Sequence, residues 1–419
     1  MGSEPERDTI CENDWVVLQS SDGKKVLGNV TNNSSVRIGK RKRKIGALLG
    51  KHWGDTFAVT AQDFLQPVAD IPEETPDEKD MGTARNNQHL QDDNANQTLR
   101  QSAILKLKEA GVHGESLVQT VVKHSSTFHS KTPFSQHKYL QRKRAKFDIR
   151  VRVFKPTALT VCETYFEKSP EKTMSLRADA LGMVLGYSGV RSGARVLLYE
   201  NCTGLLTAAV AERLGGNGTV INVFTGHTPP GIEIIRMLNL GETRMKTIAH
   251  TPVELLSHVH EREVEDDQPL KYGPREGQEA GGTANGNNEH VPSAKRAEAI
   301  AQRPKRGEVK RWIRRGCDCL IVATRFDVVK VFDVLLKHVA PSGCFAAYCT
   351  HLQDAADLQY ALQLSKMAIR VELMEVNMVN HQILPGRSHP AMTDSATGGY
   401  IVSGIRILSP NEEEPEEQS

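Results

Sequence analysis

The N-terminal part of the chain alternates short apolar runs with polar turn signals. Residues 14–66 include DWVVLQSSDGKKVLGNV and then SVRIGKRKRKIGALLGKHWGDTFAV. Ser21-Asp22-Gly23 separates two strand-like runs, which predicts a β-hairpin with its turn at this place. Several short strands within so few residues favour a small barrel or sandwich. We therefore predict a small β-barrel-like, RNA-binding domain over residues 13–70.

A polar segment and then a basic helical segment follow. Residues 71–97 include IPEETPDEKD and NNQHLQDDNANQ, which are too polar to bury much surface, so they predict a linker. The run LRQSAILKLKEAG has apolar positions at i, i+3 and i+4 and ends at Gly111, which predicts a helix. FSQHKYLQRKRAKFDIRVRVFKP begins as a basic helix and continues as an alternating strand. Residues 98–155 are thus expected to form a helical and basic connector.

From residue 156 the pattern changes to alternating helices and strands. TMSLRADALGMVLGY, LLTAAVAERLG and IEIIRML predict helices, and ARVLLYE and GTVINVF predict strands. The alternation resumes with CDCLIVATR, VVKVFDVLLKHV, GCFAAYC, a helix near residues 353–367, AIRVELMEVN and GGYIVSGIRIL. This rhythm predicts an α/β domain over residues 156–409, with a parallel sheet covered by helices.

Two segments fall outside this α/β pattern. The stretch at about 262–306 contains the low-complexity EGQEAGGTANGNNEH, and we expect it to be a disordered surface insert. Residues 410–419 end in NEEEPEEQS, which predicts a solvated acidic tail.

Composition sets limits on this picture. The 419 residues are enough for two or more domains, and a formal net charge of +2 gives little information about partners. The seven cysteines contain no C-x-x-C pair, which favours buried free thiols in a reducing compartment. No stretch approaches a membrane span, and the N-terminus MGSEPERDT has no signal-peptide core. The sequence therefore predicts a soluble intracellular protein.

The stretch LLYENCTGLL, residues 197–206, joins a predicted strand to a predicted helix. Rossmann-like methyltransferases have the pattern E-x-G-x-G-x-G here, because bare backbone lets S-adenosylmethionine approach. With the last glycine aligned on Gly204, the acidic position falls on Leu198 and the other glycines fall on Glu200 and Cys202. A shifted alignment makes Glu200 the acidic residue and still lacks glycines. We expect the Glu200 and Cys202 side chains to occupy the space that the cofactor needs.

Two further positions lack the residues that methyl transfer requires. At the end of GTVINVF, the carboxylate that would bind the cofactor ribose is replaced by Phe224. At the end of CDCLIVATRFD, the aspartate of adenine N1 methylation is replaced by Ala323, and Arg325 replaces the following proline. Asp318 and Asp327 are expected to be structural, Asp327 as a helix cap. We therefore assign no catalytic, cofactor-binding or metal-binding residue to this chain.

Six segments together resemble one known family. In this order around the glycine-poor loop, they resemble the non-catalytic, tRNA-binding subunit of the two-component tRNA (adenine-58-N1)-methyltransferase. The resemblance covers most of residues 13–409, apart from the two low-complexity segments. The segments are FSQHKYLQRKRAKF (134–147), YFEKSPEKTMSLRADALGMVL (165–185), ENCTGLLTAAVAERLGGNGTV (200–220), DCLIVATRFD (318–327), VAPSGCFAAYC (339–349) and LPGRSHPAMTDSATGGYIVSG (384–404).

The resemblance implies a degenerate Rossmann-like methyltransferase domain that is a pseudoenzyme. It implies that a catalytic paralogue of the same fold binds S-adenosylmethionine and forms a heterotetramer of two heterodimers with this chain. The complex would bind tRNA and form 1-methyladenosine in the T-loop. Two alternatives stay open: an autonomous S-adenosylmethionine-dependent RNA methyltransferase with divergent motifs, and a translation-associated RNA-binding protein.

Two basic clusters indicate where RNA binds. The run Lys40-Arg41-Lys42-Arg43-Lys44 lies in or beside the small β-domain, where adjacent cations suit phosphate contacts. The same run is typical of a nuclear-localisation signal, and both roles can coexist, so we expect a nuclear protein. The second cluster is Lys138, Arg142, Lys143, Arg144 and Lys146. Its positions 138, 142 and 146 share one helix face, and only Asp148 offsets the charge as far as Lys155.

Smaller features complete the set of candidate residues. Arg387 and His389 lie on the loop between the last two strands, which the resemblance places near the subunit junction. We expect tRNA or partner contacts there, although a plain turn also explains Ser-His-Pro. Phe134, Tyr139 and Phe147 are expected to be packing residues rather than platforms for stacked bases.

Overall fold

The computed structural model describes residues 7–21, 23–60, 64–68, 96–112, 114–261, 264–270, 272, 301–383, 388–392 and 397–408. Most of the predicted linker, residues 71–95, and the acidic tail, residues 410–419, lie outside these ranges. By its internal contacts the chain divides into two units. The first contains residues 1–156 and 380–394, and the second contains residues 157–379 and 395–419.

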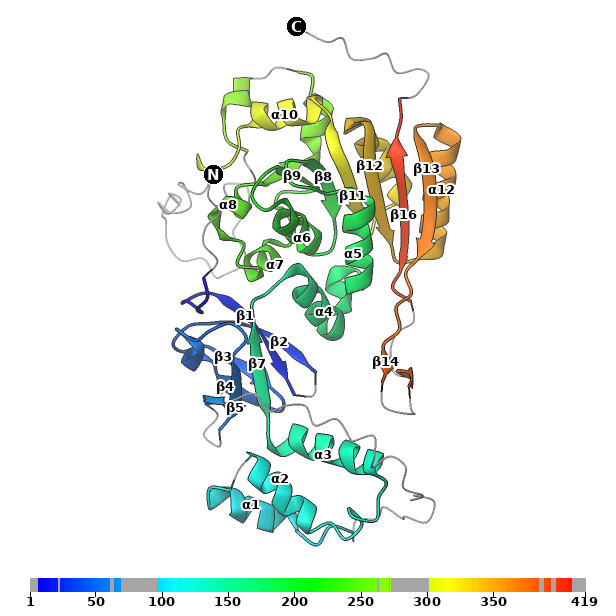
Figure 1. Ribbon diagram of the computed structural model, residues 1–419. Coiled ribbons are helices and arrows are strands. Elements are labelled where there is room, and N and C mark those ends of the chain that lie inside the picture. Colours follow the sequence, from blue (N-terminus) through cyan, green and yellow to red (C-terminus); the bar gives the residue numbers. More distant parts are fainter. Residues whose placement is uncertain are drawn as a thin grey trace, which may run out of the picture. The chain divides into compact units, whose positions relative to one another are not determined.

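The first unit contains a five-stranded antiparallel sheet with the strand order β2-β1-β7-β5-β6 (Figure 1). A separate hairpin, β3 with β4, packs Ile38 into the same core as Phe57 and Val153. The short strands expected from the N-terminal pattern are confirmed. The bounds are β1 (Trp15–Ser20), β2 (Lys25–Asn29), β3 (Ser35–Ile38), β4 (Arg41–Lys44), β5 (Thr56–Val59), β6 (Leu65–Val68) and β7 (Arg150–Phe154).

The place of β7 differs from the sequence-based expectation. The pattern assigns residues 98–155 to a connector, but β7 lies between β1 and β5 in the first sheet. Val151 and Val153 of this strand are buried in the core. Local alternation shows that a segment is extended, but it does not identify a partner strand so far away in the sequence. Because β2 and β6 are the edges of the sheet in the described part of the unit, these strands do not close into a hydrogen-bonded barrel.

Three helices lie between β6 and β7 in the sequence: α1 (Gln101–Glu109), α2 (Gly114–Lys123) and α3 (Pro133–Phe147). As expected, α1 ends just before Gly111, which has a φ of +87°. The Thr132 hydroxyl begins α3 by accepting a hydrogen bond from the Ser135 amide at 3.3 Å. No residue of α3 is buried, so its basic side chains are at least partly accessible.

The second unit contains a seven-stranded sheet with the order β10-β9-β8-β11-β12-β16-β13 (Figure 1). Numbered along the unit, this order is 3-2-1-4-5-7-6, and β16 is antiparallel to both of its neighbours. That arrangement is the Rossmann-like methyltransferase fold, so the predicted fold class is confirmed. The strands are β8 (Arg195–Glu200), β9 (Thr219–Phe224), β10 (Ile248–Pro252), β11 (Cys317–Ala323), β12 (Val339–Cys349), β13 (Ala368–Glu375) and β16 (Tyr400–Arg406).

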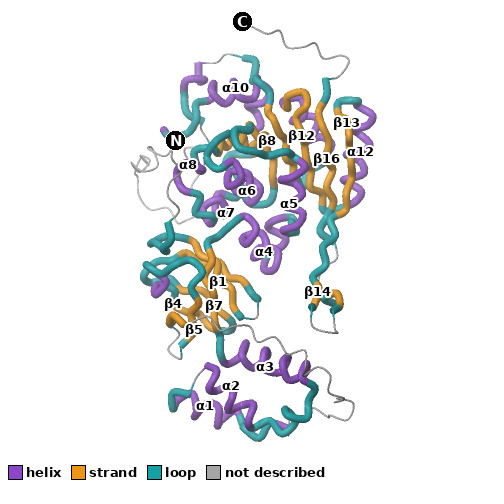
Figure 2. Tube along the Cα trace, in the orientation of Figure 1, coloured by secondary structure: helices purple, strands orange, loops and turns teal. Residues whose placement is uncertain are grey.

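Helices cover the second sheet, and α5 and α6 lie in front of it in the views of Figures 1 and 2. Apolar residues of α10, α11 and α12 pack with strand residues such as Leu320 and Phe345 in one buried cluster. The helices are α4 (Ala158–Lys168), α5 (Ala178–Tyr187), α6 (Leu205–Leu214), α7 (Ile232–Met237), α8 (Gly241–Met245), α10 (Arg306–Arg314), α11 (Val328–Leu335) and α12 (Leu352–Ser365).

Two details of the second unit depart from the sequence pattern. Strand β10 was not predicted, because His250, Thr251 and Pro252 break its apolar run. The predicted insert at about 262–306 is too long, because residues 264–270 and 301–306 have described structure at its two ends. The Leu270 amide donates to the Pro304 carbonyl at 3.1 Å, and further hydrogen bonding continues into α10. Residues 273–300, the interior of that insert, lie outside the described ranges.

Two further expectations concern the chain as a whole. All seven cysteines are free thiols, and five of them are buried, in agreement with the sequence-based interpretation. In the part of the chain that the structure describes, no helix combines the length and the apolarity that a membrane crossing needs.

Candidate functional site

The turn between β8 and α6 occupies the place of a methyltransferase cofactor loop. Glu200 is the last residue of β8, and its side chain is buried. Its carboxylate accepts hydrogen bonds from the Leu206 amide at 3.1 Å and the Thr207 amide at 2.7 Å, and also from the Thr207 hydroxyl. Burial raises the pKa of the Glu200 carboxyl, although these donors oppose the shift. Glu200 therefore caps the N-terminus of α6 from within the domain.

This geometry selects between the two sequence alignments of the loop. Because β8 ends at Glu200, the acidic position of the motif is Glu200 and not Leu198, which lies inside the strand. The glycine positions then fall on Cys202, Gly204 and Leu206. The expectation that the Glu200 side chain fills the cofactor space is wrong, because that side chain is turned onto α6. Cys202 is buried, and burial raises the pKa of its thiol well above the ordinary value.

The one retained glycine contacts the protein's own backbone. Gly204 has a φ of +87°, and a Cβ atom placed on it would lie 2.1 Å from the Gly231 carbonyl oxygen. A Cβ atom on Gly231 would lie 1.9 Å from the carbonyl carbon of Thr203. Both positions therefore need glycine for a backbone-to-backbone approach. The bare backbone of Gly204 therefore packs against another part of this chain.

A second set of contacts joins this turn to the end of β11 and to the 3-10 helix η4 (Pro170–Thr173). Asn201 accepts a hydrogen bond from the Arg325 amide at 2.9 Å through its side-chain oxygen. The Arg325 guanidinium donates to the Glu171 carbonyl, and the Thr203 hydroxyl donates to the Lys172 carbonyl at 3.2 Å. Arg325, which stands where the catalytic motif has a proline, thus holds η4 beside the loop.

The residues at the other two motif positions, and the two nearby aspartates, lie within the fold as follows. Ala323 is buried at the end of β11 and is paired with Glu200 in the register of the two parallel strands. Phe224 is buried at the end of β9, with its ring centroid 5.8 Å from that of Tyr272. Asp327 caps α11 by accepting from the Val329 amide at 3.1 Å. Asp318 accepts from the Arg195 amide at 2.7 Å, so both aspartates have structural contacts.

The first basic cluster lies on the β3–β4 hairpin, and its five cations differ in exposure. Arg43 is buried, and burial together with Arg41 lowers the pKa of its guanidinium. The other members, Lys40, Arg41, Lys42 and Lys44, are exposed. Arg37 is exposed as well and is paired with Lys42 across the hairpin. Sequence reasoning missed Arg37, although a period of two along both strands would have placed it among the outward cations.

The basic side chains of the second cluster, on α3, differ in their contacts and in their exposure. Arg144 donates to both carboxylate oxygens of Glu115 on α2, at 3.0 and 2.9 Å. Arg142 and Lys146 are exposed, whereas Lys138 and Lys143 are partly buried. The lysine ammonium groups lie over aromatic rings: Lys138 over Phe134 at 4.5 Å, Lys143 over Tyr139 at 4.9 Å and Lys146 over Phe147 at 5.2 Å. These rings thus have intramolecular contacts, as expected for packing residues.

The third candidate lies on a short hairpin formed by β14 (His381–Gln382) and β15 (His389–Pro390). His389 is exposed, and its Nδ1 lies 2.8 Å from the Pro390 carbonyl oxygen. Arg387 lies outside the described residues. Two large apolar side chains, Ile383 and Met392, are 80% and 90% exposed beside this hairpin. Among the residues with described positions, no three His, Cys, Asp or Glu side chains gather as metal ligands would.

Comparison with known proteins shows relatives over most of the chain. A family model described as the Gcd10p family matches residues 9–280. The tRNA (adenine(58)-N(1))-methyltransferase non-catalytic subunit TRM6 of Mus musculus is 28% identical, and the alignment covers 96% of this chain and 89% of the relative. The protein of the same name from Dictyostelium discoideum is also 28% identical, with 96% and 80% covered.

Two solved structures to which this chain is similar are named as methyltransferases. The tRNA (m1A58) methyltransferase TrmI from Aquifex aeolicus has a TM-score of 0.46 at 10% identity, covering 96% of this chain and 100% of that protein. A SAM-dependent O-methyltransferase from Thermotoga maritima has a TM-score of 0.49 at 11% identity, covering 97% of each chain.

Proposed function

The chain belongs to the Gcd10p family, and on this basis we propose that it is the non-catalytic subunit of a tRNA (adenine-58-N1)-methyltransferase. In this role it binds tRNA and supports a catalytic paralogue that forms 1-methyladenosine in the T-loop. The observation that favours this role most is the loop after β8. There the backbone of Gly231 packs directly against Gly204, so the one glycine that remains of the cofactor motif serves a contact within this chain.

The partner, and not this chain, binds S-adenosylmethionine in this proposal. A methyltransferase site needs bare backbone at its loop, a carboxylate for the ribose and an acidic catalytic residue. Here these places hold a closed backbone contact, buried Phe224 and buried Ala323. Each substitution removes a separate requirement, so restoring one of them would not restore the site.

Binding to tRNA uses the exposed members of the two basic clusters. The outward face of the β3–β4 hairpin presents Arg37, Lys42 and Lys44 together with Lys40 and Arg41. On α3, the exposed Arg142 and Lys146 share one helix face with the partly buried Lys138. Phosphate neutralisation by such side chains gives affinity without base readout. Arg43 and Arg144 are set apart from this role, because one is buried and the other is paired with Glu115.

Assembly and location follow from the same role. We place the contact with the partner at the β14–β15 hairpin, because large exposed apolar side chains such as Ile383 and Met392 are typical of protein interfaces. Two heterodimers would then form a heterotetramer. The exposed basic run of the β3–β4 hairpin suits nuclear import, so a nuclear location is part of the proposal.

Titration calorimetry with S-adenosylmethionine tests the central claim. The isolated full-length chain should give no binding heat, whereas the co-expressed complex with a glycine-intact paralogue should bind the cofactor. The paralogue is the positive control, because its loop retains the glycines that this chain lacks. Saturable binding of the cofactor by the isolated chain at micromolar concentration would overturn the proposal.

A further inference from the structure

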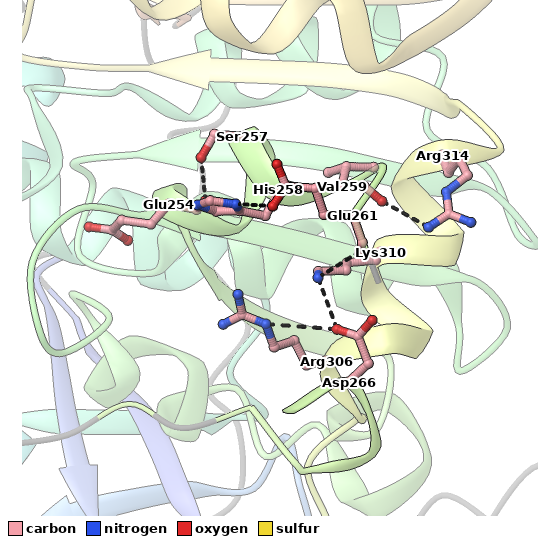
Figure 3. A network of polar contacts seen from close by, with 9 residues as sticks. All are labelled: Glu254, Ser257, His258, Val259, Glu261, Asp266, Arg306, Lys310 and Arg314. Atoms are coloured by element: carbon pink, nitrogen blue, oxygen red, sulfur yellow. Dashed lines mark hydrogen bonds and ion pairs between the residues drawn. The ribbon is translucent and has the colours of Figure 1, made fainter. Parts of the chain in front are cut away.

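Helix α10 and the residues that follow it contain a group of cations outside the RNA contacts proposed above. Two basic side chains of α10 form ion pairs within the fold (Figure 3). Lys310 is 1% exposed, and its ammonium lies 2.9 Å from an Asp266 carboxylate oxygen and 3.1 Å from the Glu261 carbonyl oxygen. Arg306 lies 3.9 Å from the same carboxylate oxygen. Lys310 and Arg306 therefore hold α10 to residues 261 and 266, which precede it in the chain.

The other three cations, Arg311, Arg314 and Arg315, are exposed. Arg314 donates to the Val259 carbonyl at 2.9 Å, so a neutral group holds it in place and its charge is not cancelled (Figure 3). None of the three forms an ion pair with an acid in the described parts of the chain. Positions 311, 314 and 315 are related by i, i+3 and i+4, so they share one side of the helix end.

More cations reach the same edge of the seven-stranded sheet. Arg314 and Arg315 immediately precede β11, Lys337 precedes β12, and Arg406 ends the antiparallel β16. The starts of parallel strands and the end of an antiparallel neighbour meet at one edge of a sheet. His260 follows Val259, the residue that Arg314 contacts. We call Arg311, Arg314, Arg315, Lys337 and His260, all exposed, the amino-edge patch.

The acids near this edge have basic partners of their own, and one of these, His258, is charged only when it is protonated. Asp318 accepts from the Arg195 amide, with the two side chains 3.6 Å apart. The Glu261 carboxylate lies 2.7 Å from His258 Nδ1. The local balance of charge is therefore positive, although the whole chain is nearly neutral.

A buried histidine adjoins the patch and gives a second, independent observation. His338 is 9% exposed, and its Nε2 atom has no hydrogen-bond partner among the described residues. Burial and then the charges of Lys337, His260 and Arg406 lower the pKa of His338 to about 4, which places these groups within electrostatic reach of one another. At neutral pH the ring is therefore uncharged and retains one N–H. Buried polar atoms without a partner are uncommon in folded proteins.

A purely structural interpretation explains part of this arrangement. Helices that cover a parallel sheet end at this edge, and cations are favoured at helix C-termini. That effect suits Arg314 and Lys337, but it does not require three exposed arginines within five positions or a buried ring nitrogen without a partner beside them.

We propose that the amino-edge patch is an additional binding site for the phosphate backbone of tRNA. This inference rests on the proposed function and deepens it. Because the patch lies at the opposite edge of the sheet from Glu200 and Ala323, it cannot form part of a cofactor cleft in this chain. The patch would bind a part of the RNA that lies away from the edge with Glu200 and Ala323.

Charge reversal of Arg311 and Arg315 in the full-length chain tests this site, because it leaves the Arg314 contact in place. The R311E/R315E variant should bind tRNA about fivefold more weakly at about 0.1 M salt, with a slope of log affinity against log salt that is smaller by about two. The matched control R236E/R244E makes the same change of charge on α7 and α8, where both arginines have no described acid partner. It should change the affinity by less than about twofold.

The outcomes separate the patch from the proposed function. If the wild type binds tRNA and R311E/R315E has the same affinity and salt slope, the patch proposal alone is overturned. An equal loss of tRNA affinity in R236E/R244E would also overturn the patch proposal alone. An acidic protein segment as the true occupant would give that unchanged result. Failure of wild-type tRNA binding, alone and with the paralogue, would instead overturn the proposed function.

Chemical footprinting gives a second measurement that needs no variant. Phenylglyoxal modifies accessible arginines, so bound tRNA should protect Arg311 and Arg315 but not Arg236, as read by mass spectrometry. Equal modification of Arg311 and Arg315 with and without tRNA would contradict the proposal. A merely stabilising role of these side chains would leave their modification unaffected by tRNA.

Discussion

At the scale of single residues, Glu200 retains the acidic position of a cofactor motif but serves the fold. Its carboxylate accepts from two amides of α6 and from Thr207, and it is 2% exposed. The sequence predicts that this position no longer supports a cofactor. The direction of the side chain could not be predicted, because a buried carboxylate can face either a ligand or a helix N-terminus.

Removing this carboxylate should destabilise the second unit. Glu200→Ala leaves the α6 donors without an acceptor, so the free energy of unfolding should fall by about 1–3 kcal/mol. Glu200→Gln keeps an acceptor oxygen and should cost less. Urea denaturation measures both changes.

The pH dependence of that stability has a defined sign. Burial raises the pKa of Glu200, so the native state holds the proton more tightly than the unfolded state. Its contribution is fully present below the unfolded pKa of about 4.3 and is lost as the pH rises through the folded pKa. The stability of the wild type relative to Glu200→Gln should therefore fall as the pH rises from about 4 toward neutrality. The exposed Glu233→Gln variant is the control, and a flat difference for Glu200→Gln would contradict the assignment.

At the scale of elements, α3 shows that one basic run can serve two purposes. Its sequence predicts a cationic stripe, and Arg142 and Lys146 are exposed as such a stripe requires. Arg144 instead forms a bidentate ion pair with Glu115 of α2, a partner 29 positions earlier in the chain. A helical pattern groups residues by face, but it does not show which face meets another helix.

Two substitutions in α3 separate these purposes. Arg142→Glu should weaken tRNA binding by about threefold to tenfold, reduce the salt slope by about one and leave the thermal midpoint unchanged. Arg144→Glu should lower stability by about 0.2–1 kcal/mol, because the two side chains are about one third exposed. The charge swap R144E/E115R should restore that stability. An equal loss of stability in Arg142→Glu, or no rescue by the swap, would contradict this division.

At the scale of the whole molecule, the second unit keeps the strand order of an enzyme fold while its carboxyl edge is closed by its own segments. Gly231 lies against the Thr203–Gly204 backbone, and Arg325 bonds to η4. The retained frame is consistent with a role for the outer surfaces of this unit, among them the amino-edge patch. This view favours a subunit over an autonomous enzyme.

Co-expression tests this view for the complete protein. A glycine-intact paralogue should co-purify with this chain in equal amounts, at the native mass of two heterodimers. Only the complex, and neither subunit alone, should methylate tRNA. Methyl transfer by this chain alone would support the autonomous enzyme. A chain that binds tRNA but with which no paralogue co-purifies would support a translation-associated RNA-binding protein.

The sequence by itself determined the α/β alternation, the class of fold, the basic runs and the chemical deficits at Phe224 and Ala323. These properties depend on local periodicity and on residue identity, which a single chain displays directly. Only the tertiary structure decided that β7 completes the first sheet, that Arg43 and Arg144 differ from the cations beside them, and that Gly231 fills the place beside Gly204. Such facts depend on which distant segments meet, because burial and pairing arise from contacts that no local pattern contains.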